Sequence, residues 1–297
     1  MSLNGRVAIV TGAGGGLGRC HALFLAGQGA RVVVNDVAQE AADRVAAEVV
    51  AAGHEAIAIA ASVTDEAGVA AMVQQAMDRW GRIDILVNNA GVLRDKSFAK
   101  MSLDDFRLVV DVHLMGAAIC TKAVWEIMRE QRYGRVVMTT SSSGLYGNFG
   151  QANYGAAKMA LVGLMQTLAI EGEKYDVRVN ALAPTAATQM THGVLSDSSL
   201  DLLDPALVSP GLLALVGEHA PTRAILCAGA GHFAASNVTL TQGRYIGADA
   251  DAGEQLISHW EEVTDRTGEI VPAYGFTQAE RELASAGMVA PVAATRQ

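Results

Sequence analysis

Short apolar runs that alternate with helical patterns constrain the fold of this chain more than any other feature. The predicted strands are Val7–Val10, Arg31–Asp36, Ala56–Ala60, Ile83–Val87, Arg135–Thr140, Val177–Leu182 and Ala224–Gly229. Helical patterns lie between them, the longest at 103–129, where only Gly116 interrupts it, and at 154–174. This alternation indicates a parallel sheet with right-handed crossovers and helices on both faces. We therefore expect an α/β fold, a Rossmann-like doubly wound parallel sheet of about seven strands.

The chain length suits one large domain with an extension. The chain has 297 residues, of which 51% are hydrophobic, enough for a sizeable core. We predict a dinucleotide-binding domain over 1–243. A C-terminal extension follows over 244–297, and we expect it to pack on the domain or near the substrate cleft. Weak strand character near Val238–Leu240 and a helix near Glu254–Thr264 are the last regular patterns.

Composition excludes several classes of function. The net charge of −9 argues against binding to nucleic acid or to an anionic membrane surface. Three scattered cysteines and seven histidines show no disulfide or metal-ligand spacing, so we expect no metal and a reducing, cytoplasmic location. No apolar run reaches transmembrane length, and no signal peptide precedes the first strand.

A glycine-rich loop follows the first predicted strand and leads into a helix. It runs from Thr11 to Gly18, and the residues expected to bind a cofactor are Gly12, Gly14, Gly16, Leu17 and Gly18. A strand, such a loop and a helix N-terminus together direct backbone N–H groups at a pyrophosphate. The alternative is a tight turn without a ligand, but the context of alternating strands favours phosphate binding.

Asp36 ends the second predicted strand, eighteen positions after Gly18. A carboxylate at this place in a dinucleotide-binding unit accepts hydrogen bonds from the adenosine ribose and repels a 2′-phosphate. This favours NAD over NADP. Arg19 is the opposing signal, because an arginine near the loop can pair with a 2′-phosphate. Asp36 could otherwise serve only as a cap for the helix that follows.

Further candidates also follow strands. Ser62 and Val63 are expected near the adenine, and the small residues Asn89, Ala90 and Gly91 allow a ligand to approach the backbone. Pro184 and Thr185 follow the sixth strand. Ligands of such sheets bind beyond the carboxyl ends of the strands, where all these residues fall. The polar stretch from Thr185 to Ser209 is long for a connection and suggests a lid.

Tyr154 and Lys158 are four residues apart, so on a helix they share one face. An ammonium about 4 Å from a phenol could lower the phenol pKa by roughly 3 units, towards neutrality. Such a tyrosine is a general acid–base catalyst. Ser141 ends the preceding strand and can direct its hydroxyl to the same place. The alternative is a solvent-facing tyrosine and lysine on an ordinary helix.

Together these motifs resemble the short-chain dehydrogenase/reductase superfamily. Its glycine loop corresponds to Thr11–Gly18, its Asn-Asn-Ala-Gly motif to Asn88–Gly91, and its serine, tyrosine and lysine to Ser141, Tyr154 and Lys158. Ser142 and Ser143 compete for the serine role, but the family spacing of thirteen residues before the tyrosine selects Ser141.

The resemblance is strongest to the (3R)-hydroxyacyl-CoA dehydrogenase branch found in peroxisomal multifunctional enzymes. It extends over roughly Leu3–Gly243 and includes Val33–Asp36, Asn88–Asp95, Asp111–Leu114 and Gly144–Tyr154. The chain departs from that pattern in two places. Val37 leads directly into a helix where the branch has a glycine-rich insertion, and Thr185 replaces a common glycine. Hydratase and sterol-carrier domains are also missing.

The resemblance implies reversible hydride transfer between NAD and a secondary alcohol or ketone. Tyr154 would exchange the proton, Lys158 would lower the Tyr154 pKa and hold the nicotinamide ribose, and Ser141 would bind the substrate oxygen. Asn89 to Gly91 would line the path of the adenosine and ribose, and Thr188 would contact the carboxamide. The family's fourth catalytic residue is an asparagine at a helix distortion, and His113 takes its place in this chain. We expect His113 to have a structural role.

The expected substrate is a small molecule, a 3-hydroxyacyl-CoA or 3-oxoacyl-CoA. Arg94, Lys96 and Lys100 are candidates for a local basic patch that binds CoA. A steroid or other secondary alcohol is the first alternative, and a non-catalytic dinucleotide-binding protein is the second. The resemblance also implies a homodimer or homotetramer. Leu161, Leu164, Met165 and Leu168 on the Tyr154 helix are expected to add apolar surface for two-fold assembly.

Overall fold

A computed structural model describes residues 3–187 and 200–287. The chain divides into two compact units, Met1–Ser236 and Asn237–Gln297. The division follows Ser236, whereas the sequence places it after Gly243. How the extension packs stays a prediction.

The first unit contains one eight-stranded sheet with the order β3-β2-β1-β4-β5-β6-β7-β8. Its strands are β1 Val7–Val10, β2 Arg31–Asp36, β3 Ala56–Ala60, β4 Ile85–Asn88, β5 Gly134–Thr139, β6 Val177–Thr185, β7 Ile225–Gly229 and β8 His232–Ser236. The first seven strands run parallel, which confirms the expected doubly wound α/β sheet. The eighth, β8, pairs antiparallel with β7 and was not predicted.

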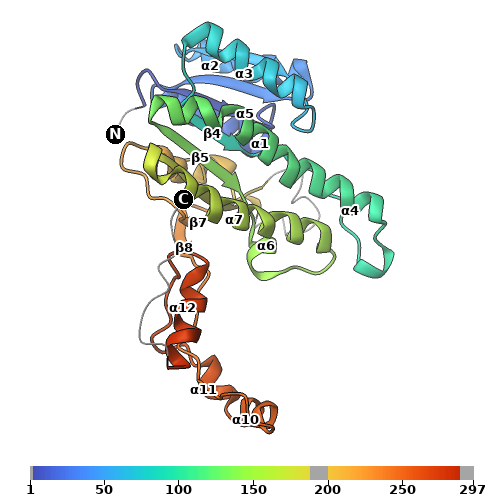
Figure 1. Cartoon of the computed structure of the whole chain (residues 1–297). Helices are drawn as coiled ribbons and strands as arrows, with labels where there is room; N and C mark the ends of the chain where they lie inside the picture. The colour runs from blue at the N-terminus through green and yellow to red at the C-terminus, as the bar shows by residue number, and fades with distance from the viewer. Residues whose placement is uncertain (1–2, 188–199, 288–297) are drawn as a thin grey trace. The chain divides into compact units, whose positions relative to one another are not determined.

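The helices of the first unit cover both faces of this sheet (Figure 1). They are α1 Gly16–Gly27, α2 Gln39–Ala51, α3 Glu66–Trp80, α4 Leu103–Val110, α5 Gly116–Gln131, α6 Ser142–Tyr146, α7 Ala152–Gly172 and α9 Pro210–Val216. Short 3₁₀ turns lie at Phe98–Lys100, Glu173–Tyr175 and Pro205–Leu207. The central strands β1, β4 and β5 are buried along their whole length, as expected for a parallel sheet covered on both faces.

Alternate residues along each strand pack into one or the other of two hydrophobic cores. Ile9 and Val136 pack with α3, α5 and α7 on one face of the sheet. Val10 and Val137 pack with α1, α2 and α9 on the other. The period of two along each strand therefore assigns every buried side chain to one of the two helical layers.

The predicted helix over 103–129 is interrupted earlier than expected. The π-helical segment Asp111–Met115 separates α4 from α5, and Gly116 is the first residue of α5. The continuous stretch Leu103–Gln131 has 29 residues, and an 18-residue window within it has a mean hydropathy of 1.5, so it is long and apolar enough to cross a membrane. The prediction that no apolar run reaches transmembrane length is therefore wrong by length and composition. Length and composition alone are weak evidence for a membrane span, because core helices of globular proteins also have them. In this structure 44% of the window is buried.

The apolar residues of α7 also differ from expectation. Leu161 and Met165 are fully buried in the core, and Leu164 and Leu168 are half-buried against it. Leu161 and Met165 therefore serve their own sheet, whereas Leu164 and Leu168 keep part of their surface exposed. Two-fold assembly stays a prediction.

The second unit has little core of its own. Its helices are α10 Ala252–Ser258, α11 Trp260–Thr264 and α12 Phe276–Ser285, and none of their residues is buried. The expected helix over 254–264 is thus two short ones. Leu240 forms only an isolated antiparallel bridge with Ile270, so the strand expected near Val238–Leu240 is wrong.

A buried carboxylate stabilises the edge of the sheet where the strands begin. Asp84, just before β4, is fully buried and accepts hydrogen bonds from the Val7 N–H at 2.9 Å, from Arg6 at 3.0 Å and from Arg82 at 2.6 and 2.8 Å. These contacts tie the start of β1 to the start of β4.

Asp84→Ala should therefore lower the free energy of unfolding of the first unit by about 3 kcal/mol, because it leaves Arg82 and a buried N–H without their acceptor and Arg6 with Glu218 alone. Asp78→Ala is the matched control, since Asp78 is exposed on α3 and accepts only from Gln74. Urea unfolding followed by circular dichroism measures both. Equal midpoints for the two variants would contradict the assigned role of Asp84.

Candidate active site

The loops that follow β1 and β4 are held together by Thr11 and Asn89. The Thr11 hydroxyl accepts hydrogen bonds from the backbone N–H groups of Asn89 at 3.0 Å and Ala90 at 3.1 Å. The Asn89 amide donates to the carbonyls of Thr11 at 2.9 Å and Gly12 at 3.1 Å. Two segments far apart in sequence therefore meet at the carboxyl edge of the sheet. Thr11 was not among the predicted site residues, although it begins the glycine motif.

Glycine is required in this loop because the backbones approach so closely. A Cβ at Gly18 would lie 2.2 Å from the Gly12 carbonyl oxygen, and one at Gly12 would lie 2.7 Å from the Ala90 Cα. Gly12 also has a φ of +61°, which favours glycine. Gly16 and Leu17 begin α1, so N–H groups of its first turn face the same edge. This cradle fits a pyrophosphate.

The Asp36 carboxylate faces the glycine loop. One oxygen accepts from the Gly14 N–H at 2.9 Å, and the other accepts from the Ala38 N–H at 3.2 Å. The N-cap residue of α2 is Ala38, and α2 has no side-chain cap hydrogen bond. Asp36 therefore does not act as the N-cap of that helix. The Arg19 guanidinium forms a bidentate pair with Glu48 on α2 at 2.9 and 3.1 Å. Asp36 is thus turned toward the loop, and Arg19 is engaged elsewhere.

The remaining cofactor candidates lie in different surroundings. The Val63 side chain is buried in the core against Gly116, whereas the Ser62 hydroxyl pairs with Thr64 at 2.8 Å. Pro184 and Thr185 are the last residues of β6 and pair with β7. Their cofactor contacts stay predictions, and Thr188 lies outside the described residues.

Ser141, Tyr154 and Lys158 come together as predicted. Ser141 caps the N-terminus of α6, and Tyr154 and Lys158 lie in the first two turns of α7. The Ser141 side chain is near enough to Tyr154 to lower the Tyr154 pKa. Ser142 is exposed, and the Ser143 hydroxyl donates to Gln151 at 2.7 Å, so Ser141 is the serine of the set. A Cβ at Gly144 would lie 2.7 Å from the Lys158 Cβ, which shows how closely α6 packs on α7.

Burial governs the ionisation of this site. Burial raises the Tyr154 pKa above its usual value of 10.0, the hydrogen bond from Ser141 lowers it, and the charge of Asp95 raises it. Burial lowers the Lys158 pKa to about 7. The Lys158 Nζ donates to the Thr139 carbonyl at 2.5 Å and lies 5.5 Å from the Tyr154 ring centroid. The prediction that Lys158 draws the Tyr154 pKa down is therefore wrong for this structure, since the ammonium is directed at a backbone carbonyl.

His113 lies in the π-helical segment and contacts the backbone of another loop. Its Nε2 is 2.8 Å from the Val92 carbonyl oxygen and 3.1 Å from the Val92 N. Its ring meets the Tyr154 ring edge-on, with centroids 5.2 Å apart, and a Cβ at Gly91 would lie 2.3 Å from its Cε1. The expected helix distortion is present, but the side chain bonds to Val92 rather than to its own helix. The His113 pKa is lowered to about 3, mainly by burial and to a smaller extent by the charge of Lys158.

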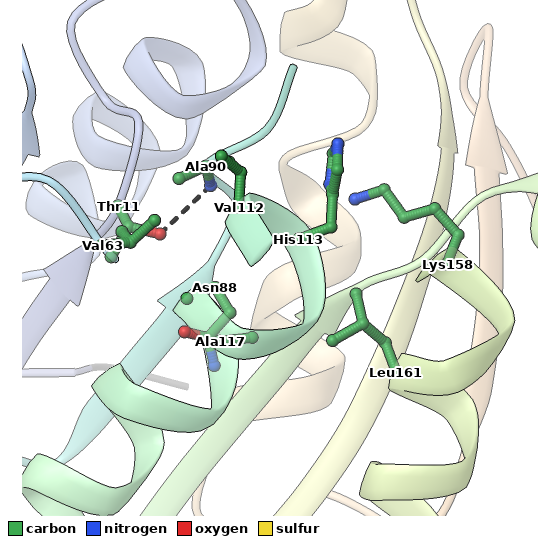
Figure 2. Close-up of a pocket in the computed structure, with 10 residues that line it drawn as sticks. Thr11, Val63, Asn88, Ala90, Val112, His113, Ala117, Lys158 and Leu161 are labelled. Carbon is green, nitrogen blue, oxygen red and sulfur yellow. Dashed lines mark hydrogen bonds between the residues drawn. The ribbon is translucent and has the colours of Figure 1, made fainter. Parts of the chain in front are cut away.

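A small cavity of about 10 Å³ lies between these groups (Figure 2). It is lined by Thr11, Val63, Asn88, Ala90, Val112, His113, Gly116, Ala117, Lys158 and Leu161. Figure 2 shows the ammonium end of Lys158 directed toward His113. The volume admits about one water molecule, so this cavity is too small for a substrate.

Two side chains that sequence reasoning missed border the catalytic set. Asn153 is fully buried and donates to the Arg94 carbonyl at 3.1 Å. Gln151 donates to Asp95 at 2.6 Å. Their positions directly before Tyr154 were the only signal in the sequence, because amides give no spacing pattern of their own.

Similar proteins are found both by sequence and by structure. A family model described as short chain dehydrogenase matches residues 6–199. The peroxisomal multifunctional enzyme type 2 of Drosophila melanogaster is 51% identical over 224 residues, which are 72% of this chain and 37% of that enzyme. The solved full-length structure of that enzyme has a TM-score of 0.81 at 38% identity and covers 96% of this chain and 50% of its own.

Two further proteins match over most of their own length. A putative short-chain type dehydrogenase/reductase of Mycobacterium tuberculosis is 45% identical over 274 residues, 89% of this chain and 95% of that protein. A 7α-hydroxysteroid dehydrogenase, solved with NADH and 7-oxo glycochenodeoxycholic acid, has a TM-score of 0.71 at 28% identity and covers 77% of this chain and 95% of its own. By both family model and near full-length relative, this chain belongs to the short-chain dehydrogenase family and is an oxidoreductase that uses a nicotinamide dinucleotide.

Proposed function

We propose that the protein interconverts a secondary alcohol and a ketone with NAD, and that its substrate is a 3-hydroxyacyl-CoA or 3-oxoacyl-CoA. The observation that carries this proposal is that Ser141, Tyr154 and buried Lys158 lie together at the sheet edge that carries the glycine cradle.

The residues divide the chemistry among them. The bound nicotinamide supplies or accepts the hydride. The Tyr154 hydroxyl gives its proton to the ketone oxygen, and Ser141 donates a hydrogen bond to the same oxygen as negative charge develops on it. Because burial raises the Tyr154 pKa, the hydroxyl stays protonated at neutral pH, which suits ketone reduction. Oxidation needs the deprotonated form and should gain rate as the pH rises. We expect Lys158 to bind the ribose of the dinucleotide.

The names of several relatives support the acyl substrate. They include a peroxisomal hydratase-dehydrogenase-epimerase of Saccharomyces cerevisiae and a 3-oxoacyl-[acyl-carrier-protein] reductase of Synechocystis, in addition to the Drosophila enzyme. The chain spans about a third of the multifunctional enzymes, so their whole activity does not transfer to it.

The expected basic patch for CoA is weaker than the sequence suggests. Lys96 pairs with Asp105 at 3.1 Å, and Arg94 lies 3.9 Å from the same carboxylate. Lys100, at the end of an exposed 3₁₀ turn, is the remaining candidate cation of the three. A steroid substrate is the second candidate, because the hydroxysteroid dehydrogenase shares the fold over most of its length.

Oxidation of NADH should be faster with acetoacetyl-CoA than with any member of a ketosteroid panel.

Tyr154→Phe should still bind NADH but lose at least ~100-fold in turnover, because only the acidic hydroxyl is removed. Tyr175→Phe is the matched control, since Tyr175 bonds to Arg129 away from the site, and it should keep full activity. Faster turnover of a ketosteroid would favour the second candidate, and an active Tyr154→Phe would refute the catalytic assignment.

The choice of NAD over NADP rests on Asp36 and Arg19. A 2′-phosphate would meet the Asp36 carboxylate beside Gly14, while the Arg19 charge is already paired with Glu48. The wild type should prefer NAD, and Asp36→Ala should narrow that preference by admitting NADP. Glu48→Gln tests the contribution of Arg19, because it removes the carboxylate charge that pairs with the Arg19 guanidinium. Ratios of kcat/KM for the two cofactors measure both effects, and equal use of both cofactors by the wild type would contradict the assignment.

His113→Asn should keep turnover within roughly tenfold of the wild type, about 1.4 kcal/mol of barrier. With a pKa of about 3, His113 is neutral at any assay pH near neutrality, so it contributes no ionisation to the pH–rate profile. The amide of asparagine can still bond to the Val92 backbone. A loss as large as that of Tyr154→Phe, or the disappearance of a pKa near 6–7 from the profile, would show that His113 takes part in proton transfer.

A further inference from the structure

Three hydrogen bonds join the segment 94–96 to the segment 150–153, directly before Tyr154. The Gln151 amide donates to the Asp95 carboxylate at 2.6 Å, the Lys96 N–H donates to the Gly150 carbonyl at 2.9 Å, and the Asn153 amide donates to the Arg94 carbonyl at 3.1 Å. The first segment continues from Asn89–Gly91 of the cofactor cradle. The contacts therefore join the cradle to the start of α7.

Gln151 lies at the centre of these contacts. Its Oε1 accepts from the Ser143 hydroxyl at 2.7 Å and from the Asn148 amide at 3.2 Å, while its Nε2 donates to Asp95. Only this orientation of the amide satisfies all three partners. Its backbone carbonyl also accepts from the Gly155 N–H at 2.7 Å, in the first turn of α7.

The chain of contacts ends at the catalytic serine. The Ser143 N–H donates to the Ser141 Oγ at 3.2 Å, and the Ser141 side chain in turn lowers the Tyr154 pKa. Asp95 is exposed and Gln151 is half-buried, so the link runs from the surface into the site. Neither residue contacts the reacting atoms in this arrangement.

We propose that Asp95 and Gln151 are positioning residues, whose contact fixes Ser143 and through it the Ser141 hydroxyl against Tyr154. The kinetic consequence rests on the proposed function. A small displacement of Ser141 weakens the hydrogen bond to the substrate oxygen in the transition state, so the loss falls on kcat. The hydrogen bonds that hold the glycine loop come from Thr11 and Asn89 and do not involve Asp95 or Gln151, so the KM for NADH should stay unchanged.

An exchange of the two groups tests the contact. Gln151→Glu places two carboxylates face to face and should lower kcat about tenfold through misplacement of Ser141. Asp95→Asn alone keeps an acceptor for the Gln151 amide, so it should lower kcat far less than Gln151→Glu, although it also removes the charge that raises the Tyr154 pKa. The double variant Asp95→Asn/Gln151→Glu presents an amide to a carboxylate again, so kcat should return to within about threefold of wild type.

Gln74→Glu is the matched control, because the Gln74 amide donates to Asp78 at 2.7 Å on α3 in the same chemical pair. It should leave kcat unchanged. Amide hydrogen exchange over 141–158 is measured on the same proteins without substrate. It should rise in Gln151→Glu and return to the wild-type level in the double variant.

The exchange readout separates this proposal from the proposed function. If the wild type reduces none of the ketones, the proposed function fails, and exchange alone decides the positioning role. If Gln151→Glu matches the wild type in exchange, or the double variant stays as impaired as the single one, the positioning role is refuted.

Discussion

The hydrogen bonds of Thr11 and Asn89 hold together the two loops on which the site depends. One hydroxyl and one amide join the turn after β1 to the turn after β4, and no side chain intervenes where Gly12 and Gly18 approach them. Because neighbouring parallel strands end at the same edge, the loops need only these short links to form a single cradle. Asp36, the last residue of β2, then faces the glycine loop and accepts from the Gly14 N–H.

Burial sets the electrostatics of the catalytic set more than pairing does. Tyr154 and Lys158 are shifted in opposite directions, each toward its neutral form, because a low-dielectric environment disfavours either charge. The Thr139 carbonyl that receives the Lys158 ammonium is a dipole fixed by the end of β5. A tyrosine that holds its proton and a lysine close to its own pKa together form a site ready to donate protons.

The segment between residues 92 and 96 links most of these parts. His113 bonds to Val92, Asn153 to Arg94 and Gln151 to Asp95, so the π-helical segment and α7 hold this segment from both sides. The cofactor cradle and the proton donor are therefore parts of one hydrogen-bonded structure.

The sequence alone determined the strands β1, β2 and β3 to the residue, because each is a short apolar run that begins at or directly after a charged residue. It also proposed Asp36 from its distance to Gly18, Tyr154 and Lys158 from their spacing of four, and Ser141 from the family spacing before Tyr154. β8 was missed because His232–Ser236 has no β-branched residue and becomes a strand only by pairing with β7. The direction of the Lys158 ammonium, the pairing of Arg19 with Glu48 and the Gln151 contacts were decided by the tertiary structure. These contacts join residues distant in sequence, and local pattern carries no information about which partner a long polar side chain meets.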